Sequence, residues 1–258
     1  MDLAMHYGTG PDENDRLART PHGRLEYLRT RALLRRFLPA CGRVLDVGGG
    51  TGVHAAWLAA EGHSVHLVDL VADHVVQAGA RPGVTAEVGD ARHLSAPDSA
   101  FDVVLLLGPL YHLVEVADRA CALAEARRVL RPGGLLAAAG ISRYLSLLET
   151  AAAGTLTAGR VASVRTVIET GAYDGHVGFV PTHWHTAAEL RGEVASAGFA
   201  DVDVYGVEGP GWPALDVAGL ERFDGLVEGA LRAAEIAERD PGLVDVSAHL
   251  LAVARRAD

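Results

Sequence analysis

The chain has 258 residues, 49% of them hydrophobic, and a mean hydropathy of +0.17, values typical of a globular protein with one sizeable core. Its 33 acidic and 23 basic residues give a formal net charge of -10, which disfavours a nucleic-acid partner because like charges repel. No segment has 18 uninterrupted apolar residues and the start lacks a signal-peptide pattern, so we predict a cytoplasmic protein without a membrane partner.

The first predicted element is an amphipathic helix over Leu25–Leu38, which ends at Pro39 because proline cannot continue a helix. The helical spacing of its arginines predicts a solvated face rather than a nucleic-acid stripe. Strands alternating with helices follow and indicate a parallel sheet covered on both faces, a doubly wound α/β fold. The predicted strands are Arg43–Val47, Ser64–Val68, Val84–Val88, Asp102–Leu107 and Leu135–Ile141, and the predicted helices between them are Thr51–Glu61, Val71–Ala80 and Ala117–Leu130.

The pattern changes after Ile141, where two helices rich in small residues precede a loop over 171–185 rich in Gly, His and aromatic residues. We predict that residues 142–186 form a lid or substrate wall inserted between strands five and six. The remaining predicted elements complete a seven-stranded sheet in a single domain over 1–258, with residues 1–40 as a cap segment and helix. These elements are the helices Tyr144–Leu156, Gly159–Thr170, Thr186–Ala197 and Val217–Arg239 and the strands Asp201–Val207 and Val246–Val253.

A glycine-rich loop between the first strand and the next helix is the strongest motif. Its acidic residue and glycines are Asp46, Gly48, Gly49, Gly50 and Gly52. Glycines there let a ligand approach the helix start closely. A dinucleotide fingerprint would need a glycine where Val53 stands, and a P-loop would need a Gly-Lys-Ser/Thr sequence that does not follow. The acidic residue disfavours a pyrophosphate and favours a cationic ligand.

Two further acidic residues follow the second and third strands. Asp69 stands where a carboxylate can accept hydrogen bonds from ribose hydroxyls. Asp90 and Ala91 follow the third strand, where a short side chain and backbone amides can meet the edge of an adenine. Because open α/β sheets bind ligands at the carboxyl ends of their strands, we expect these residues to share one site.

These motifs, followed by Phe101-Asp-Val-Val-Leu-Leu106 and by Arg128-Val-Leu-Arg-Pro-Gly-Gly134, resemble the class I S-adenosylmethionine-dependent methyltransferases over residues 25–141 and in the last strands. The resemblance implies a Rossmann-like sheet, S-adenosyl-L-methionine as cofactor and S-adenosyl-L-homocysteine as product. It also implies a small-molecule acceptor, often in the biosynthesis of natural products or cofactors. By the same resemblance, Asp46 and the loop glycines surround the methionine part, Asp69 and Leu70 the ribose and adenine, Asp90 and Ala91 the adenine, and Leu107 the sulfonium, while Glu26 helps to close the site.

The segment after the fourth strand carries the candidates for contact with the acceptor. It is similar to the Asn-Pro-Pro-aromatic signature of enzymes that methylate base amines, but Gly108 and Leu110 depart from that signature. His112 is the candidate general base because an unperturbed imidazole titrates near neutral pH, and a helix-start histidine bonded to the backbone is the alternative. The substrate-binding candidates are Tyr7, Tyr111, His112, Arg143, Tyr144, His183 and His185.

A metal centre is not expected. His183 and His185 stand two residues apart and would share one side of an extended segment, so they could combine with His112 to hold a metal. No carboxylate cluster that would hold magnesium is visible. The two cysteines, Cys41 and Cys121, have neither metal-ligand nor disulfide spacing, and we predict that both are buried thiols.

Other functional classes stay open at this point. A nucleic-acid or protein methyltransferase is disfavoured by the negative charge and by the absence of the acidic double-Glu hairpin of the protein-arginine enzymes. A regulatory protein that binds S-adenosylmethionine without turnover, or a nicotinamide-dependent oxidoreductase, would need kinetic or binding measurements to be excluded. We expect a monomer or homodimer, and the acceptor atom is not identified by the sequence.

Overall fold

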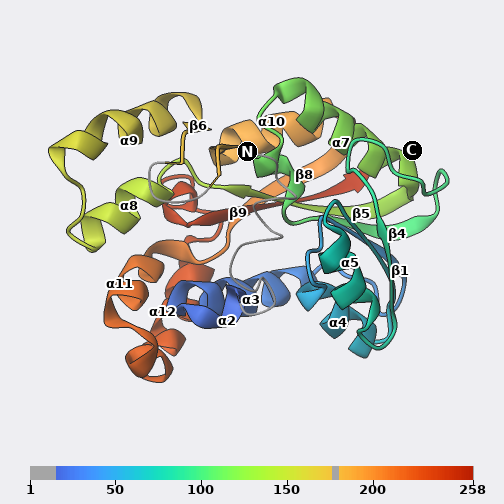
Figure 1. Cartoon of the computed structure of the whole chain (residues 1–258), viewed down its shortest axis with the longest axis horizontal. Helices are drawn as coiled ribbons and strands as arrows, with labels where there is room; N and C mark the ends of the chain where they lie inside the picture. The colour runs from blue at the N-terminus through green and yellow to red at the C-terminus, as the bar shows by residue number, and fades with distance from the viewer. Residues whose placement is uncertain (1–15, 176–179, 258) are drawn as a thin grey trace.

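The computed structural model describes residues 16–175 and 180–257. Its centre is a seven-stranded sheet in the order β3-β2-β1-β4-β5-β9-β8 (Figure 1). Strands β1 to β5 pair in parallel, whereas β9 runs antiparallel to both β5 and β8. The predicted doubly wound, Rossmann-like sheet is confirmed. Its strands are β1 (Arg43–Val47), β2 (Ser64–Asp69), β3 (Val84–Val88), β4 (Phe101–Leu106), β5 (Leu130–Ile141), β8 (Phe199–Gly206) and β9 (His249–Arg256).

Helices cover both faces of this sheet, because neighbouring residues along each strand point to opposite faces. Leu45 of β1 packs into a core with α7 and α10, while the adjacent Val44 packs into a second core with α3 and α4. Figure 1 shows α7 and α10 above the sheet and α3 and α12 below it. The helices are α2 (Arg16–Arg19), α3 (Pro21–Arg35), α4 (Val53–Ala60), α5 (Ala72–Gly79), α6 (Pro109–His112), α7 (Val116–Val129), α8 (Leu145–Ala152), α9 (Ala158–Thr170), α10 (Ala187–Ser196), α11 (Trp212–Ala218) and α12 (Phe223–Ala237).

The reversed direction of β9 decides which residues reach the functional edge of the sheet. His249, the first residue of β9, pairs with Ile141, the last residue of β5. The amino end of β9 therefore lies at the same rim as the carboxyl ends of β1 to β5. Asp46 and Asp69 lie at this rim, near the ends of β1 and β2.

The bounds of several predicted elements differ in the structure, and three of the differences lie after residue 170. The single long helix predicted over Val217–Arg239 is wrong, because Gly219 takes φ 77° and ψ 170° and separates α11 from α12. The last strand begins at His249 rather than Val246, since Val244–Val246 forms a 3-10 turn. The loop predicted over 171–185 contains a short antiparallel ladder between β6 (Ala172–Tyr173) and β7 (Thr182–His183).

Burial differs from the prediction at three positions. Both cysteines are exposed rather than buried: Cys41 lies in the loop before β1, and Cys121 lies on the outer side of α7. Arg29 is buried rather than solvated, because α3 is packed between the sheet and α12. Its guanidinium donates to the Val207 carbonyl at 3.1 Å and to the Glu238 carboxylate at 2.7 Å.

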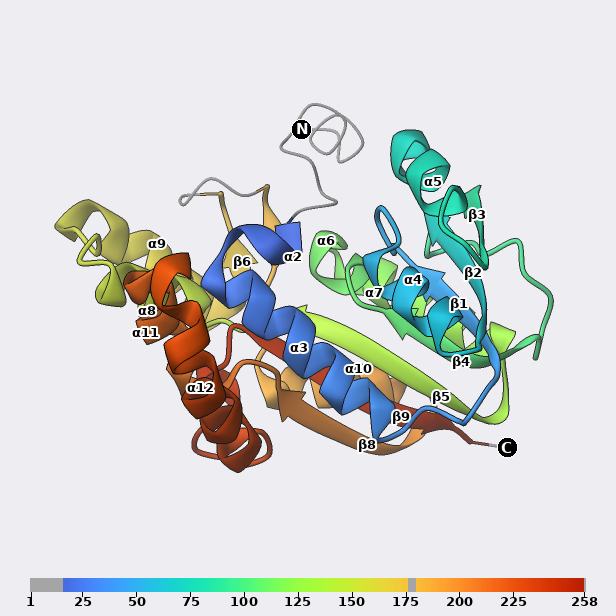
Figure 2. The same ribbon diagram turned by 90° about the horizontal axis from the view of Figure 1, so that it is seen from below.

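The segment predicted as a lid, residues 142–186, contains α8, α9 and the β6–β7 ladder. Figure 2 shows α8 and α9 at the opposite end of the molecule from α4 and α5. Several residues of this segment reach the rim of the sheet, as described below. Among the helices of residues 16–175 and 180–257, none has the length and apolar character needed to cross a bilayer.

Candidate functional site

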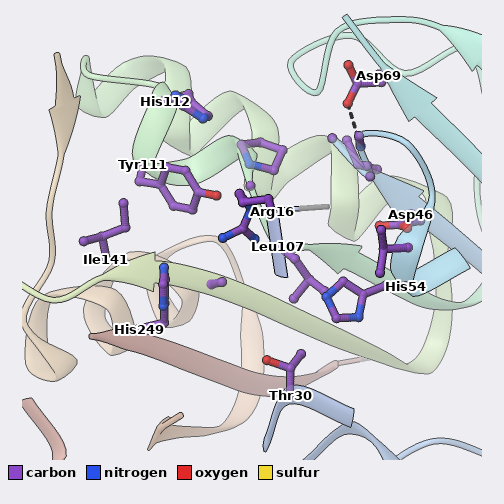
Figure 3. Close-up of a pocket in the computed structure, with 18 of the residues that line it drawn as sticks. Arg16, Thr30, Asp46, His54, Asp69, Leu107, Tyr111, His112, Ile141 and His249 are labelled. Atoms are coloured by element: carbon purple, nitrogen blue, oxygen red, sulfur yellow. Dashed lines mark hydrogen bonds between the residues drawn. The ribbon is translucent and has the colours of Figure 1, made fainter. Parts of the chain in front are cut away.

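A cavity of about 650 Å³ opens along the rim of the sheet (Figure 3). Small-molecule sites in proteins fall in the same range, about 300–1,000 Å³. On one side the cavity is lined by the glycine loop and the ends of β2 and β3, and on the other by α3, the start of β9 and the segment 142–186. One continuous space therefore joins the predicted cofactor residues to the predicted substrate wall.

The glycine loop brings its backbone against neighbouring groups too closely for a side chain. A Cβ on Gly48, which has φ +67°, would lie 2.7 Å from the ring of Pro109. A Cβ on Gly49 would lie 2.6 Å from Oδ2 of Asp46. Glycine is required at both positions for steric reasons. The result is a half-buried backbone edge that lines the cavity.

Asp46 is a buried carboxyl group without a counter-charge. It is 1% exposed, and neither carboxylate oxygen has a hydrogen-bond partner in the described part of the chain. Burial, followed by repulsion from Asp69, raises the pKa of Asp46 to about 7. Because a buried unpaired carboxylate is costly, a cationic ligand in the cavity would be bound favourably here.

Asp69 is held in a fixed orientation by the loop. Its Oδ2 accepts from the backbone N–H of Gly50 and its Oδ1 from that of Val71, each at 2.9 Å, and His74 Nδ1 lies 3.4 Å from Oδ1 (Figure 3). A carboxylate has about four lone-pair sites, so acceptor capacity remains for hydroxyl groups in the cavity. The structure places Asp69 and the neighbouring Leu70 on the cavity, together with the glycine loop.

Asp90 and Ala91 also line the cavity, but the carboxylate of Asp90 is already engaged. Arg92 donates to it from its guanidinium at 2.7 Å and from its backbone N–H at 2.9 Å. These bonds, above all those from the Arg92 side chain, hold the pKa of Asp90 below its usual range. The buried Ala91 offers a small surface on which a flat ring can rest.

The middle of the cavity is formed by the end of β4 and by α6, with His54 also on its wall. Leu107, Tyr111 and His112 all line this part. His54 Nδ1 accepts a hydrogen bond from Trp57 Nε1 at 3.2 Å. Burial lowers the pKa of His54 to about 4, so at neutral pH the ring is uncharged and its proton lies on Nε2.

The far wall of the cavity is apolar and aromatic. Tyr173 and Trp184 stack with their ring centroids 4.4 Å apart, and both line the cavity together with Ile141 and Leu145. Both rings are almost fully buried, which gives this wall a fixed shape. This end of the cavity suits a ligand with a sizeable apolar surface.

Glu26 lies on the cavity and is neutralised by Arg16. The guanidinium donates two hydrogen bonds of 3.0 Å to the two carboxylate oxygens. Burial alone would raise the pKa of Glu26, but the charges of Arg16 and then His249 outweigh it and lower the pKa to about 2. Glu26 thus lines the cavity, although its charge is balanced within the protein.

A second buried carboxylate, Glu208, was not singled out from the sequence. It is 0% exposed, and its Oε1 lies 2.6 Å from Nδ1 of His249. Its Oε2 accepts from Ser247 Oγ at 2.7 Å and from the His249 N–H at 2.9 Å. His22 Nε2 lies 3.4 Å from Oε1. Glu208 is therefore surrounded by donors from distant parts of the chain.

These contacts decide the charges of the group. Burial alone would raise the pKa of Glu208, but His249 and His22 outweigh it and hold the pKa well below its usual range. Burial alone would lower the pKa of His22, but the hydrogen bond with Glu208 raises it to about 9. At neutral pH, Glu208 is a carboxylate and His22 an imidazolium. The available sequence signal was a glutamate just after one predicted strand and a histidine inside the next, and the two meet at the rim because β9 is antiparallel.

Four of the predicted substrate residues lie outside the lining of the cavity. The guanidinium of Arg143 pairs with Glu189 and donates to the Trp184 carbonyl. His183 and His185 have carboxylate partners on α10: Glu189 at 2.9 Å and Glu193 at 3.3 Å, respectively. The remaining predicted positions are Tyr144, beside Arg143, and Tyr7, which lies outside the described residues.

The described residues contain two groups of side chains close enough together to share a metal ion. His183 and His185 do lie side by side, with ring centroids 4.7 Å apart, but the third member of their group is Glu193 and not His112. The second group joins Glu26 to the Glu208 contacts, so the fold gathers carboxylates that the sequence argument did not find. That group is His22, Glu26, Glu208 and His249.

Comparison with known proteins identifies relatives of this chain. Residues 44–134 match the family described as "Methyltransferase domain". The chain is 31% identical over 246 residues to 27-O-demethylrifamycin SV methyltransferase of Amycolatopsis mediterranei, covering 91% of this chain and 80% of that protein. It is 35% identical over 147 residues to methyltransferase GfsG of Streptomyces halstedii, covering 53% of this chain but only 50% of that protein.

Solved structures share the fold at lower identity. A protein from Pyrococcus horikoshii aligns with a TM-score of 0.62 at 18% identity, covering 98% of each chain. A possible histamine N-methyltransferase from Thermotoga maritima, described as SAM-dependent, aligns with a TM-score of 0.61 at 20% identity, covering 92% of this chain and 91% of that one. At these identities the likeness concerns the fold.

Proposed function

Because the chain belongs to the S-adenosylmethionine-dependent methyltransferase family, we propose that it transfers a methyl group from S-adenosylmethionine to a small-molecule acceptor in a biosynthetic pathway. The cofactor supplies an electrophilic methyl group on a sulfonium. The relatives' names point to small molecules, among them a rifamycin and demethylmenaquinone. The relatives differ in acceptor, so the acceptor of this chain has to be argued from its own cavity.

The glycine-loop side of the cavity fits this cofactor. We assign the carboxylate of Asp46 to the ammonium group, because it is buried and lacks a counter-charge among the described residues. Asp69, oriented by the backbone of the loop, would accept from the ribose hydroxyls. Ala91 and Leu70 would flank the adenine, and Leu107 would lie beside the sulfonium.

The observation that carries the proposal is the continuity of this side with the aromatic far wall. An acceptor resting against Tyr173 and Trp184 would share one cavity with the methyl donor. Methyl transfer requires the acceptor atom to be held about 3 Å from the methyl carbon and in line with sulfur. A walled cavity of this kind favours a small molecule over a polymer, in agreement with the net charge of -10.

The test begins with isothermal titration of the purified protein with S-adenosylmethionine, S-adenosylhomocysteine and NAD. We expect micromolar binding of the first two and no binding of NAD. Asp69→Asn should weaken binding about tenfold or more because a charged acceptor is lost, whereas the matched variant Asp73→Asn, on the exposed side of α5, should bind as the parent does. Binding of NAD instead of S-adenosylmethionine would reject the proposal.

Product release would then identify the acceptor. The enzyme with bound S-adenosylmethionine is offered candidate small molecules, and formation of S-adenosylhomocysteine is measured. Turnover on a small molecule is the expected result. Cofactor binding without turnover on any acceptor class would favour a regulatory protein over an enzyme.

A further inference from the structure

Resting on this proposed function, we propose that His249 is the general base of the methyl transfer, that Glu208 is its positioning residue, and that the acceptor group is a hydroxyl. His249 is the first residue of β9 and lies at the rim of the sheet opposite Ile141. It lines the same cavity as the aromatic far wall. Figure 3 shows its ring rising from β9 on the side of Tyr111 and Ile141, away from Asp46 and Asp69.

The contacts of the two ring nitrogens differ in the way that a general base requires. Nδ1 lies 2.6 Å from Oε1 of Glu208, so the proton of the neutral ring belongs on Nδ1. Nε2 has no hydrogen-bond partner in the described part of the chain. The neutral ring therefore keeps a bare lone pair for a ligand in the cavity. A catalytic imidazole oriented by a carboxylate has the same arrangement.

The backbone fixes this pair as firmly as the side chains do. The His249 N–H donates to Oε2 of Glu208 at 2.9 Å, and the Val207 N–H donates to the His249 carbonyl at 2.9 Å. Ser247 Oγ accepts from the Glu208 N–H at 2.7 Å and donates to its carboxylate at 2.7 Å. Glu208 and His249 are thus ordered before any acceptor binds, which lowers the entropic cost of reaching the reactive geometry.

The charged groups around His249 are paired in the described structure. Glu26 lies 3.9 Å from Nδ1 but is bound by Arg16. The ring centroid of His22 is 5.5 Å from that of His249. His22 Nε2 lies beside Glu208, and His22 Nδ1 lies 3.7 Å from Oδ2 of Asp216. When His249 gains a proton, the carboxylate of Glu208 already lies against the new positive charge. The surroundings therefore accommodate the protonated ring that the reaction would produce.

The other histidines of the cavity are less suited to this role. His54 is engaged by Trp57 on Nδ1, and burial lowers its pKa to about 4, which makes it a weak base. His74 lies beside Asp69, on the side assigned to the ribose. His112, the candidate from the sequence, has its ring centroid 4.7 Å from that of Tyr111. His249 is selected because it combines a carboxylate at hydrogen-bond distance from Nδ1 with a place beside the far wall.

The proton and electron movements balance for a hydroxyl acceptor. As the acceptor oxygen bonds to the methyl carbon, the bond from that carbon to sulfur breaks and its electron pair stays on sulfur. The hydroxyl proton passes to Nε2 of His249, while Glu208 retains the hydrogen bond to Nδ1. The products are a methyl ether, S-adenosylhomocysteine and a protonated His249, which then releases its proton to water. A weakly acidic hydroxyl needs such a base, because its oxygen is a poor nucleophile while it keeps its proton.

The kinetic test compares His249→Gln with a matched control. The control is His66→Gln, whose ring also meets a glutamate, Glu87 at 3.5 Å, but lies outside the cavity lining. Phenols of graded acidity and secondary alcohols are offered, and release of S-adenosylhomocysteine is measured. His249→Gln should lower kcat about 100-fold or more, with the affinity for S-adenosylmethionine within about threefold of the parent. His66→Gln should leave both unchanged.

The pattern of loss separates a base from a structural residue. The loss in His249→Gln should shrink toward none for a phenol that is already ionised, such as 4-nitrophenol at alkaline pH, and imidazole added to His249→Ala should restore part of the turnover. An equal loss for every acceptor, without rescue, would overturn the proposal. Methylation of amines or thiols but of no hydroxyl would overturn the acceptor class while leaving the proposed function intact. Failure to bind S-adenosylmethionine would instead reject the proposed function.

A spectroscopic test on the parent protein needs no acceptor. Nitrogen-15 NMR of the parent protein with bound S-adenosylhomocysteine reports which ring nitrogen of His249 carries a proton. We expect the proton of the uncharged ring on Nδ1, with a bare Nε2. Glu208→Gln should change this tautomer balance. An uncharged ring that bears its proton on Nε2 would overturn the proposal.

Discussion

Two buried carboxyl groups, Asp46 on the lining of the cavity and Glu208 behind His249, have different surroundings in the protein. Asp46 has no hydrogen-bond partner in the described part of the chain, and burial raises its pKa to about 7. Glu208 has contacts with Ser247, His22 and His249, which hold its pKa well below its usual range. The comparison teaches that burial alone does not define a binding site. The unpaired carboxyl group is prepared for a cationic ligand, whereas the paired one orients its neighbours.

The largest expected effect is the loss of folding stability when Glu208 is substituted. Glu208→Gln removes the charge that holds two histidines, and breaking such a buried pair costs about 3–5 kcal/mol of folding free energy. We expect a lower midpoint in chemical denaturation, measured by circular dichroism. Glu228→Gln, at an exposed position on α12, is a control that should remain near the parent. A Glu208→Gln midpoint equal to the parent's would show that the pair is not an integral part of the fold.

The second substitution, Asp46→Asn, is expected to raise folding stability, whereas Glu208→Gln lowers it. Asp46→Asn should make the cofactor-free protein more stable above about pH 7, because the parent pays to ionise a carboxyl group whose pKa is raised to about 7. Each pKa unit corresponds to about 1.4 kcal/mol, and the gain should fade as the pH falls toward about 4. The same variant should bind S-adenosylmethionine about 10- to 100-fold more weakly. Thermal melts with and without cofactor would measure both.

A third prediction concerns alkaline pH. Because the folded pKa of His22 is raised to about 9, its contribution to stability is fully present below about pH 6.5 and is lost as the pH rises through about 9. The contribution of Glu208, whose pKa is lowered, is present above about pH 4.5 and is lost at lower pH. The unfolding midpoint should therefore decrease as the pH rises from about 7 to about 10. His22→Asn should flatten that decline, and an unchanged decline would assign it to other groups.

The smallest expected effect is the loss of stability when the Ser247 hydroxyl, which bonds to Glu208, is removed. Ser247→Ala removes the acceptor for the Glu208 and Gly209 N–H groups and one donor to the Glu208 carboxylate. Leaving such buried groups unsatisfied costs about 1–3 kcal/mol. The unfolding midpoint should drop by less than in Glu208→Gln. A larger drop than in Glu208→Gln would contradict the central place assigned to the carboxylate.

The two sides also differ in how far the sequence could predict them. The Asp46 side is contained in contiguous motifs that follow parallel strands, so strand order and glycine spacing were sufficient to bring Asp46 and Asp69 together. The Glu208 side joins residues 22, 208 and 249, and its assembly depends on β9 running antiparallel. Alternation of apolar residues does not report strand direction. His249 was accordingly placed inside a predicted strand and not at the rim.

Three predicted substrate residues contact α10 instead of lining the cavity. The sequence makes Arg143, His183 and His185 candidates for contact with the acceptor. In the structure, Glu189 and Glu193 of α10 bind these groups. A capping box at Thr186 fixes the start of that helix and so brings Glu189 into place. Helix position, more than residue type, decided which polar groups face the cavity.

The most direct test of the account is calorimetric titration of S-adenosylmethionine into two variants under the same conditions, at about pH 8. If the cofactor lies on the Asp46 side and the acceptor beside His249, Asp46→Asn loses about 10- to 100-fold in affinity and His249→Gln keeps the affinity of the parent. Equal losses in both variants, or a loss confined to His249→Gln, would contradict this division of the cavity.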